Sequence, residues 1–158
     1  MPGYSNGMTC LETFAALRIF SSSQHPDTVS RVLGFEATKA RPLDPASKYR
    51  PKRESHRWIW SSEGIVKSTD GLEHVRAVVD RLEGKESHLA DLRAAGCKID
   101  VCCYWVSTGQ GGPCLDASTM ADLTRLGLDI WWDVYFGDAS DYADTTQREG
   151  GNGDASAT

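Results

Sequence analysis

The stretch that decides the fold is Asp-Ile-Trp-Trp-Asp-Val-Tyr-Phe, residues 129–136. Its side chains change character with a period of two, which predicts a β-strand with two different faces. One face, which we expect to be buried in the core, consists of Ile130, Trp132, Val134 and Phe136. The other face consists of Asp129, Trp131, Asp133 and Tyr135. Because this second face mixes aromatic rings with carboxylates, it needs an explanation other than core packing.

The rest of the chain divides into similar short elements. Alternating patterns predict strands at residues 13–21, 35–40, 57–62 and 98–107. Apolar residues at helical spacing predict helices from Pro26 to Gly34, from Asp70 to Gly84, from Glu86 to Ala95 and from Ser118 to Leu126. Residues 41–54 contain three prolines and are predicted to form a loop.

Two parts of the chain look like copies of one unit. Residues 31–37 and residues 124–130 both read as a helix end, a Leu-Gly pair and the start of a strand. The alternating polarity of the strands favours a mostly antiparallel sheet with helices packed on one face. We therefore expect an α+β fold in which two related β-α-β units flank a central strand and a long helix. One domain is expected at residues 12–136, between a flexible N-terminus (1–11) and a disordered acidic tail (137–158).

Composition limits the cellular setting. The chain has 158 residues, 40% of them hydrophobic, and a net charge of −5, which is ordinary for a globular protein. No apolar run reaches the roughly 20 residues of a membrane span, and residues 1–10 have neither the basic residue nor the apolar core of a secretory signal. The five cysteines, an odd number, indicate reduced thiols. We expect a cytoplasmic protein with no membrane partner.

The catalytic and metal-binding patterns are weak. Cys102 and Cys103 are adjacent on a strand, so their side chains point to opposite faces and cannot easily share a metal ion. No cysteine stands in a recognisable signature with a histidine, and His74 and His88 are expected to face solvent from their helices. The glycine-rich segment 108–113 lacks the Lys-Ser/Thr pair of a phosphate-binding loop. We predict no catalytic residue, no metal and no cofactor.

Basic residues cluster in one segment, residues 39–57. The segment contains Lys39, Arg41, Lys48, Arg50, Lys52, Arg53 and Arg57. With Tyr49, Trp58 and Trp60 nearby, it could bind nucleic acid by charge and stacking. The acidic net charge of the whole chain argues against nucleic acid, which leaves a solvated loop and a site for an acidic protein partner as alternatives.

The second face of residues 129–136 is the strongest candidate surface. Trp131, Asp133 and Tyr135 would lie together there, and Cys102 and Tyr104 would join them if their strand is the neighbour. Aromatic residues are enriched at the hot spots of protein interfaces, so an open sheet face of this composition is typical of a protein-binding surface. Cover by a loop or by a second subunit is the open alternative.

Five stretches carry a family resemblance. They are residues 16–19 (ALRI), 26–38 (PDTVSRVLGFEAT), 58–62 (WIWSS), 72–75 (LEHV) and 126–135 (LGLDIWWDVY). Together they resemble a bacterial family known only as domain of unknown function 4279. The resemblance implies an α+β fold and carries no established activity. Members look like small stand-alone proteins, which suggests an accessory or protein-binding role.

Three functional hypotheses follow. The first is a non-enzymatic binding protein, for example an immunity protein that neutralises a toxin, and its partner surface would consist of Trp131, Asp133, Tyr135, Tyr104, Arg41, Arg53, Arg57 and Trp58. The alternative is a small enzyme or ligand-binding domain whose Arg-rich loop holds an anionic substrate. A cleft with convergent Arg, Asp and Tyr would favour this alternative, and a flat sheet face would favour the first. The third is a homodimer formed through the sheet face or edge.

Overall fold

The computed structural model describes residues 10–137 of the protein. In chain order the elements are β1 (Cys10–Ser21), α1 (Pro26–Leu33), β2 (Lys39–Arg41), α2 (Arg50–Glu54), β3 (His56–Ser61), α3 (Gly71–Arg81), α4 (Glu86–Ala94), β4 (Lys98–Ser107), α5 (Ala117–Leu126) and β5 (Asp129–Phe136). The expected flexible N-terminus, apart from Cys10 and Leu11 in β1, and the expected acidic tail beyond Gly137 lie outside the described residues. No helix within residues 10–137 is long and apolar enough to cross a membrane.

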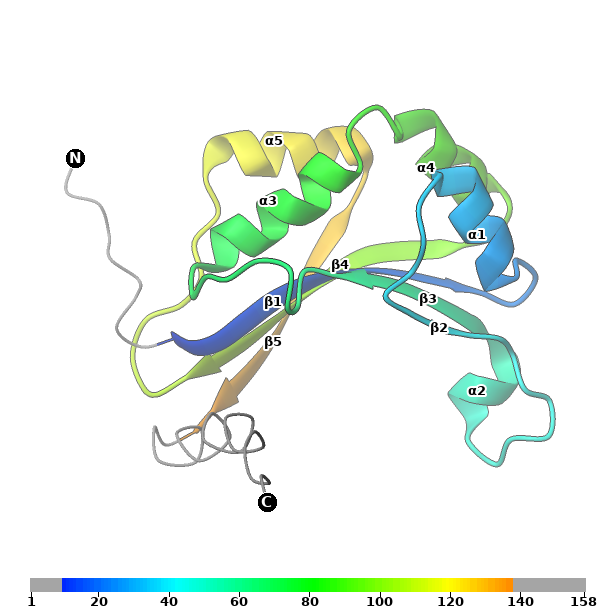
Figure 1. Ribbon diagram of the computed structural model, residues 1–158, viewed down its shortest axis with the longest axis horizontal. Coiled ribbons are helices and arrows are strands. Elements are labelled where there is room, and N and C mark those ends of the chain that lie inside the picture. The colour runs from blue at the N-terminus through cyan, green and yellow to red at the C-terminus, as the bar shows by residue number, and fades with distance from the viewer. Residues whose placement is uncertain (1–9, 138–158) are drawn as a thin grey trace, which may run out of the picture.

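The five strands form one sheet in the order β2-β3-β1-β4-β5. All neighbouring strands are antiparallel except β4 and β5, which are parallel. Helices α1, α3, α4 and α5 cover one face of the sheet, and α2 lies on the opposite side (Figure 1). The predicted α+β fold with a mostly antiparallel sheet and helices on one face is therefore confirmed.

The two outer β-α-β units differ in one respect that the sequence did not indicate. In the second unit, α5 connects two strands that pair directly, β4 and β5. In the first unit, β1 and β2 both pair antiparallel with β3, so β3 lies between them. Each unit joins two parallel strands through a helix, but the first is split by an inserted strand.

The predicted ends of α1, the predicted start of α3 and the predicted end of α5 are confirmed because their capping groups are in place, whereas α3 ends at Arg81 and not at Gly84 as expected. The His25 Nδ1 atom accepts a hydrogen bond from the Asp27 backbone N–H (3.3 Å) and Asp70 Oδ1 accepts one from the Leu72 N–H (2.9 Å), so both helices begin on a side-chain cap. Gly34 and Gly127 end α1 and α5 with φ of 77° and 64°, a conformation that costs little for glycine alone.

The core lies between the sheet and its helices. It is built on the strand side by alternate residues such as Leu17, Trp58 and Trp105, all at most 1% exposed. Trp58 is fully enclosed: its ring meets Phe35 edge-on, with centroids 5.6 Å apart, and its Nε1–H donates to Ser30 Oγ (3.0 Å). The indole is thus satisfied as well as buried, which is the usual requirement for a core tryptophan.

His74 contradicts its predicted exposure, because it is only 2% exposed. Its Nε2 lies 2.9 Å from the Ser68 carbonyl oxygen and must be the donor there; in the neutral ring Nδ1 then accepts from the Ser62 hydroxyl at 2.7 Å. Ser62 Oγ in turn accepts from the Ala15 backbone N–H (2.9 Å). The histidine therefore links the start of α3 to the centre of the sheet. His88, also predicted to face solvent, is half-buried.

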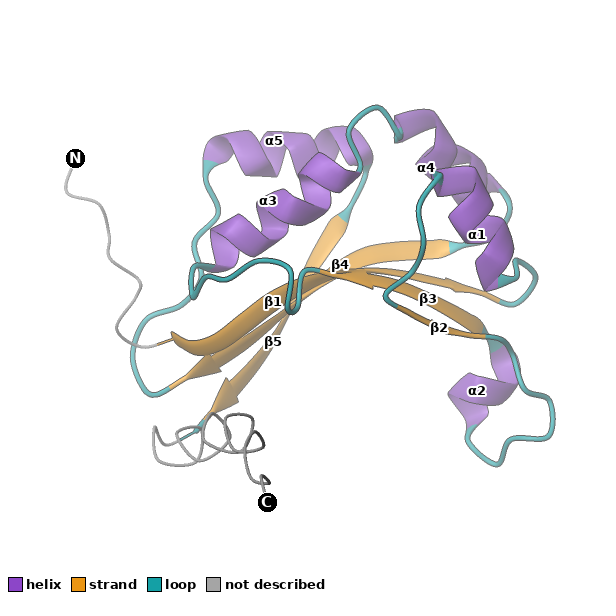
Figure 2. Cartoon of the chain, in the orientation of Figure 1, coloured by secondary structure: helices purple, strands orange, loops and turns teal. Residues whose placement is uncertain are grey.

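β5 is only partly the buried strand that its alternation predicts. Its bounds are as predicted, and Ile130 and Trp132 pack against the core. Val134 and Phe136, however, are 45% and 79% exposed. The physical reason is that the second half of β5 extends past the end of the helix layer (Figure 2). The alternation assigns the two faces of β5 correctly. It does not show that the helices leave the second half of one face uncovered.

The segment between α1 and β3 differs from its prediction at two points. The strand expected at residues 35–40 begins at Lys39, because Phe35 turns toward the core and packs on Trp58. The loop expected at residues 41–54 ends in the short helix α2, with Pro51 in its first turn. Proline is favoured in the first turn of a helix because its missing N–H would have no partner there.

Candidate binding face

The face of the sheet opposite the helices is concave, and we call it the open face. Figure 2 shows that β5 and α2 both project on this side of the sheet, so they border the concave open face. The register of β4 and β5 places Cys102 beside Trp131 and Tyr104 beside Asp133. The predicted neighbourhood of these four side chains is confirmed.

An ion pair between Arg18 and Asp100 occupies the centre of the open face. The guanidinium binds the carboxylate through two nitrogens, at 2.6 Å from Nε and 2.9 Å from Nη2. Both side chains are about one-quarter exposed. The hydrogen bond to Asp100 raises the pKa of Arg18 above its ordinary value, against the opposing effect of burial. Two-point pairing holds both groups in one orientation, so this pair is a fixed feature of the surface.

Aromatic rings follow one another across the open face beside this pair. Phe14 and Tyr104 stack with centroids 4.8 Å apart, and Tyr104 meets Tyr135 at 5.2 Å. Between the rings and the ion pair lie the small side chains Ala16, Ser61 and Cys102, which are direct partners across β3, β1 and β4. Because these three side chains are small, they leave a depression of about 200 Å³. This volume is below the range of about 300–1,000 Å³ usual for small-molecule pockets.

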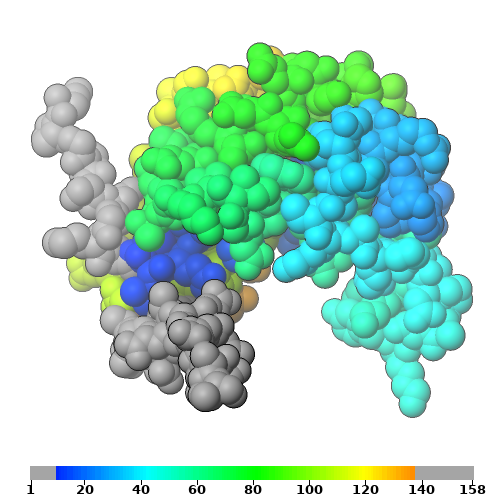
Figure 3. Space-filling model, viewed as in Figure 1, coloured from blue at the N-terminus to red at the C-terminus, as the bar shows by residue number. Residues whose placement is uncertain are grey.

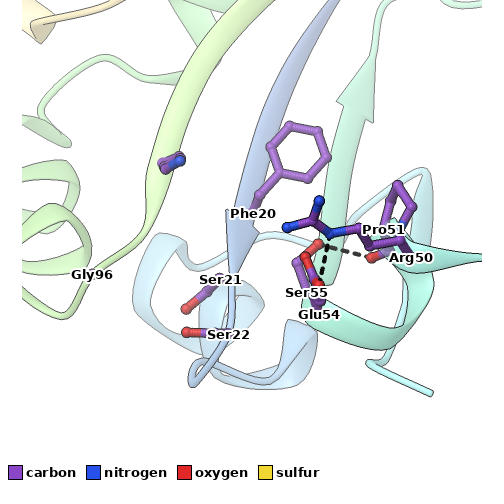
Figure 4. Close-up of a pocket in the computed structure, with 9 residues that line it drawn as sticks. Phe20, Ser21, Ser22, Arg50, Pro51, Glu54, Ser55 and Gly96 are labelled. Carbon is purple, nitrogen blue, oxygen red and sulfur yellow. Dashed lines mark hydrogen bonds and ion pairs between the residues drawn. The ribbon is translucent and has the colours of Figure 1, made fainter. Parts of the chain in front are cut away.

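Two further hollows lie where α2 stands away from the sheet. Figure 3 shows the α2 segment as a projection separated from the rest of the molecule by a recess. One hollow of about 370 Å³ is lined by β1, β3 and α2 residues and shares Arg18 and Arg57 with the central depression. The other, of about 500 Å³, lies between the end of β1 and α2, where Phe20 faces Arg50 and Pro51 (Figure 4). The open face is therefore grooved toward α2 and not flat, and this part of the face fits the ligand-binding alternative.

The outer edge of β5 carries the largest concentration of exposed apolar side chains on the sheet. Trp131 and Tyr135 are 60% and 50% exposed on the open face, and Val134 and Phe136 are exposed on the other. Within residues 10–137, β5 pairs with β4 alone. Its second edge therefore presents main-chain donors and acceptors between two rows of apolar side chains. Such an edge is a template for pairing with another chain.

Comparison with known proteins identifies the family. The family model for the domain of unknown function DUF4279 matches residues 11–137. The chain belongs to this family. No curated protein and no solved structure matches the chain. The resemblance of the five sequence stretches is thereby confirmed over nearly all of the described residues.

The candidate residues of this DUF4279 domain fall into separate groups. Trp131, Asp133, Tyr135 and Tyr104 lie together at the β5 end of the open face. Arg41 and Arg57 are direct cross-strand partners at its α2 end. Arg53 is exposed on α2 and lines none of the three hollows. Trp58 was wrongly placed on the partner surface, because it points to the helix side and is only 1% exposed.

Sequence reasoning missed the centre of the open face. Arg18 is the one charged residue within the otherwise apolar stretch 14–20. A single charge in such a stretch could have marked Arg18 as a candidate site residue. Its partner Asp100 could not be found without the strand order, because the two residues lie 82 positions apart. The stacking of Phe14 on Tyr104 depends on the same pairing of β1 with β4.

The DUF4279 domain offers no activated thiol among the cysteines whose pKa is shifted. Burial raises the pKa of Cys10 to about 11 and that of Cys103 to about 12. Burial also raises the pKa of Cys102 on the open face, with Asp133 and Asp100 adding to the effect against Arg18. Because the thiolate is the reactive species, these shifts oppose nucleophilic chemistry. No group of three potential metal ligands occurs within residues 10–137.

Proposed function

We propose that the protein is a non-enzymatic binding domain that holds another protein chain along the edge of β5 and the adjoining open face. The observation that carries this proposal is the exposed edge strand itself. Four large apolar side chains, Trp131, Val134, Tyr135 and Phe136, are 45–79% exposed on its two faces. Natural proteins usually protect such an edge with charge, proline or a covering segment, and apolar patches of this kind usually mark an interaction site.

The geometry favours a partner that adds a strand to the sheet. A strand paired with the free edge of β5 would gain main-chain hydrogen bonds, and its alternate side chains would contact opposite faces. On one face these contacts would be Trp131 and Tyr135, and on the other Val134 and Phe136. Because both rows extend along the same edge, an added strand would be enclosed from both sides.

The charges near this edge favour a basic partner. Asp129 and Asp133 are exposed on the open face of β5, and neither forms an ion pair within residues 10–137. Complementary charge increases association rates and rejects wrong partners. An immunity-type role, in which the domain neutralises a basic toxin, is the concrete form of the proposal, and an accessory subunit of a larger complex is the other form.

The expected result of a paired substitution is loss of partner binding without loss of folding. In Trp131→Ala/Tyr135→Ala, both rings that face the partner are removed from an exposed surface, so the free energy of unfolding should change by no more than about 1 kcal/mol in total. Affinity should fall at least about tenfold, since interface aromatics dominate binding energy. The measurement is recovery of partner proteins from the source cell on immobilised wild-type and variant protein, followed by titration of the recovered partner.

Met120→Ala is the matched control, because Met120 is 50% exposed on α5, on the helix side of the sheet. It should recover the same partner as the wild type. Equal recovery by the wild type and the double variant would contradict the proposal. Sedimentation of the purified protein decides whether the partner strand comes from a second copy of this chain, since the dimer would then also be lost in the double variant.

A further inference from the structure

We propose that the hollow between β3 and α2 binds the phosphoryl group of a small phosphate monoester. The hollow has a volume of about 370 Å³. Its polar lining consists of Arg18, Arg41, Lys52, Arg57, Tyr49 and Ser55. Four of these side chains are cationic and none is a carboxylate. The phosphoryl site lies at the opposite end of the open face from β5, and its lining includes none of the β5 side chains proposed to contact a protein partner.

The first observation is that three of the four cations of this hollow lack acidic partners. The fourth, Arg18, pairs with Asp100, and basic residues near the hollow are likewise neutralised: Lys39 pairs with Glu63 and Arg50 with Glu54. Arg41, Lys52 and Arg57, by contrast, form no ion pair within residues 10–137. Three positive charges are therefore left around one cavity, which a dianion would neutralise better than a single carboxylate.

The second observation is the direct opposition of two arginines. Arg41 of β2 and Arg57 of β3 are cross-strand partners on the same face. Like charges that oppose each other in this way destabilise a sheet. An anion held between the two guanidinium groups would convert this repulsion into two attractive contacts, and the planar donor fork of arginine matches the oxygens of a phosphoryl group.

The third observation is an unsatisfied donor on Arg41. Its Nη1 atom is buried and has no hydrogen-bond partner within the described part of the chain. Its Nη2 atom reaches only the Pro51 carbonyl oxygen, at 3.4 Å. A buried charged donor without an acceptor is costly. Because the Arg41 side chain borders the hollow, a small rotation of its guanidinium would bring this donor to a ligand oxygen.

The shape of the open face indicates where the organic part of the ligand lies. Arg18 and Arg57 line both this hollow and the central depression, so the two spaces are adjacent. The depression is bounded by the stacked rings of Phe14 and Tyr104. On the other side, Phe20 and Pro51 border the hollow. A monoester with a flat or apolar group would place its phosphoryl group on the arginines and this group against the aromatic rings.

The test is a titration of the full-length protein with inorganic phosphate, phenyl phosphate and malonate at constant ionic strength, followed by calorimetry and by the phosphorus NMR signal of the two phosphates. Both phosphates should bind, with phenyl phosphate the tighter. Arg57→Gln should weaken both by about tenfold to a hundredfold, the usual effect of losing a hydrogen bond to a charged group. Arg57 is exposed, so this variant should fold normally.

Arg31→Gln is the matched control, because Arg31 is an exposed residue of α1 on the helix side. It should bind both phosphates as the wild type does. Three results would overturn the proposal: no detectable binding of either phosphate, equal phosphate binding by Arg57→Gln and Arg31→Gln, or malonate binding tighter than phosphate. Because Arg57 is remote from β5, none of these results bears on recovery of a protein partner.

Discussion

Trp58→Ala is expected to destabilise the protein by about 3–5 kcal/mol, the usual cost of replacing a buried tryptophan with alanine. The indole is 1% exposed, contacts Phe35 and donates a hydrogen bond to Ser30. Its removal leaves a cavity between β3 and α1 and an unpaired buried hydroxyl. Chemical unfolding followed by circular dichroism measures the change directly.

Two substitutions separate the parts of this effect. Trp58→Phe keeps most of the volume and loses the Nε1–H donor, so it should cost less than Trp58→Ala, about 1–3 kcal/mol. Trp131→Ala removes a tryptophan that is 60% exposed and should change stability by no more than about 0.5 kcal/mol. A larger loss of stability in Trp131→Ala than in Trp58→Ala would contradict the assignment of the two tryptophans to core and surface.

Ser62→Ala is expected to have the other large effect on stability, about 2–6 kcal/mol. The Ser62 side chain is fully buried and serves two partners, because its oxygen accepts from the Ala15 N–H and its proton goes to His74 Nδ1. Alanine leaves both of these buried groups without a partner, and each unsatisfied group costs about 1–3 kcal/mol. Urea unfolding of the variant measures the sum.

The neighbouring Ser61→Ala is the control. Among residues 10–137, Ser61 Oγ accepts only from the Glu63 N–H (3.1 Å), and Glu63 is exposed, so water can replace the lost bond. Its expected cost is about 1 kcal/mol or less. Equal destabilisation by the two alanine substitutions would show that the chain from Ala15 through Ser62 to His74 does not stabilise the fold.

The period of two along residues 129–136 predicts the strand and its two faces correctly. It does not predict that Val134 and Phe136 are exposed, because cover depends on where α5 ends relative to the sheet. His74 shows the same limit in the opposite direction. It lies on a predicted helix with polar character, yet the loop that contains Ser62 and Ser68 encloses it. Local pattern specifies an element, and burial is decided by what packs on it.

The candidate surfaces show a similar division. The alternation of one strand predicts that Trp131, Asp133 and Tyr135 share a face. Their association with Tyr104 required only the further assumption that the strand of Tyr104 is the neighbour. The pairing of Arg18 with Asp100 and the opposition of Arg41 to Arg57 depend on strand order and register. The first pair forms because β1 lies beside β4, and the second because β3 inserts between β1 and β2 and pairs with β2. No local signal in the sequence specifies that insertion.

The most direct test of the binding role is a crosslink from the exposed edge of β5 inside the source cell. The photoreactive residue p-benzoylphenylalanine would replace Tyr135 in one variant and Met120 in another. Both positions are 50% exposed, so they differ in location and not in accessibility. We predict that irradiation yields one discrete protein adduct from position 135 and none from position 120. No adduct at position 135, or the same adducts at both positions, would contradict the conclusion that this edge holds a partner chain.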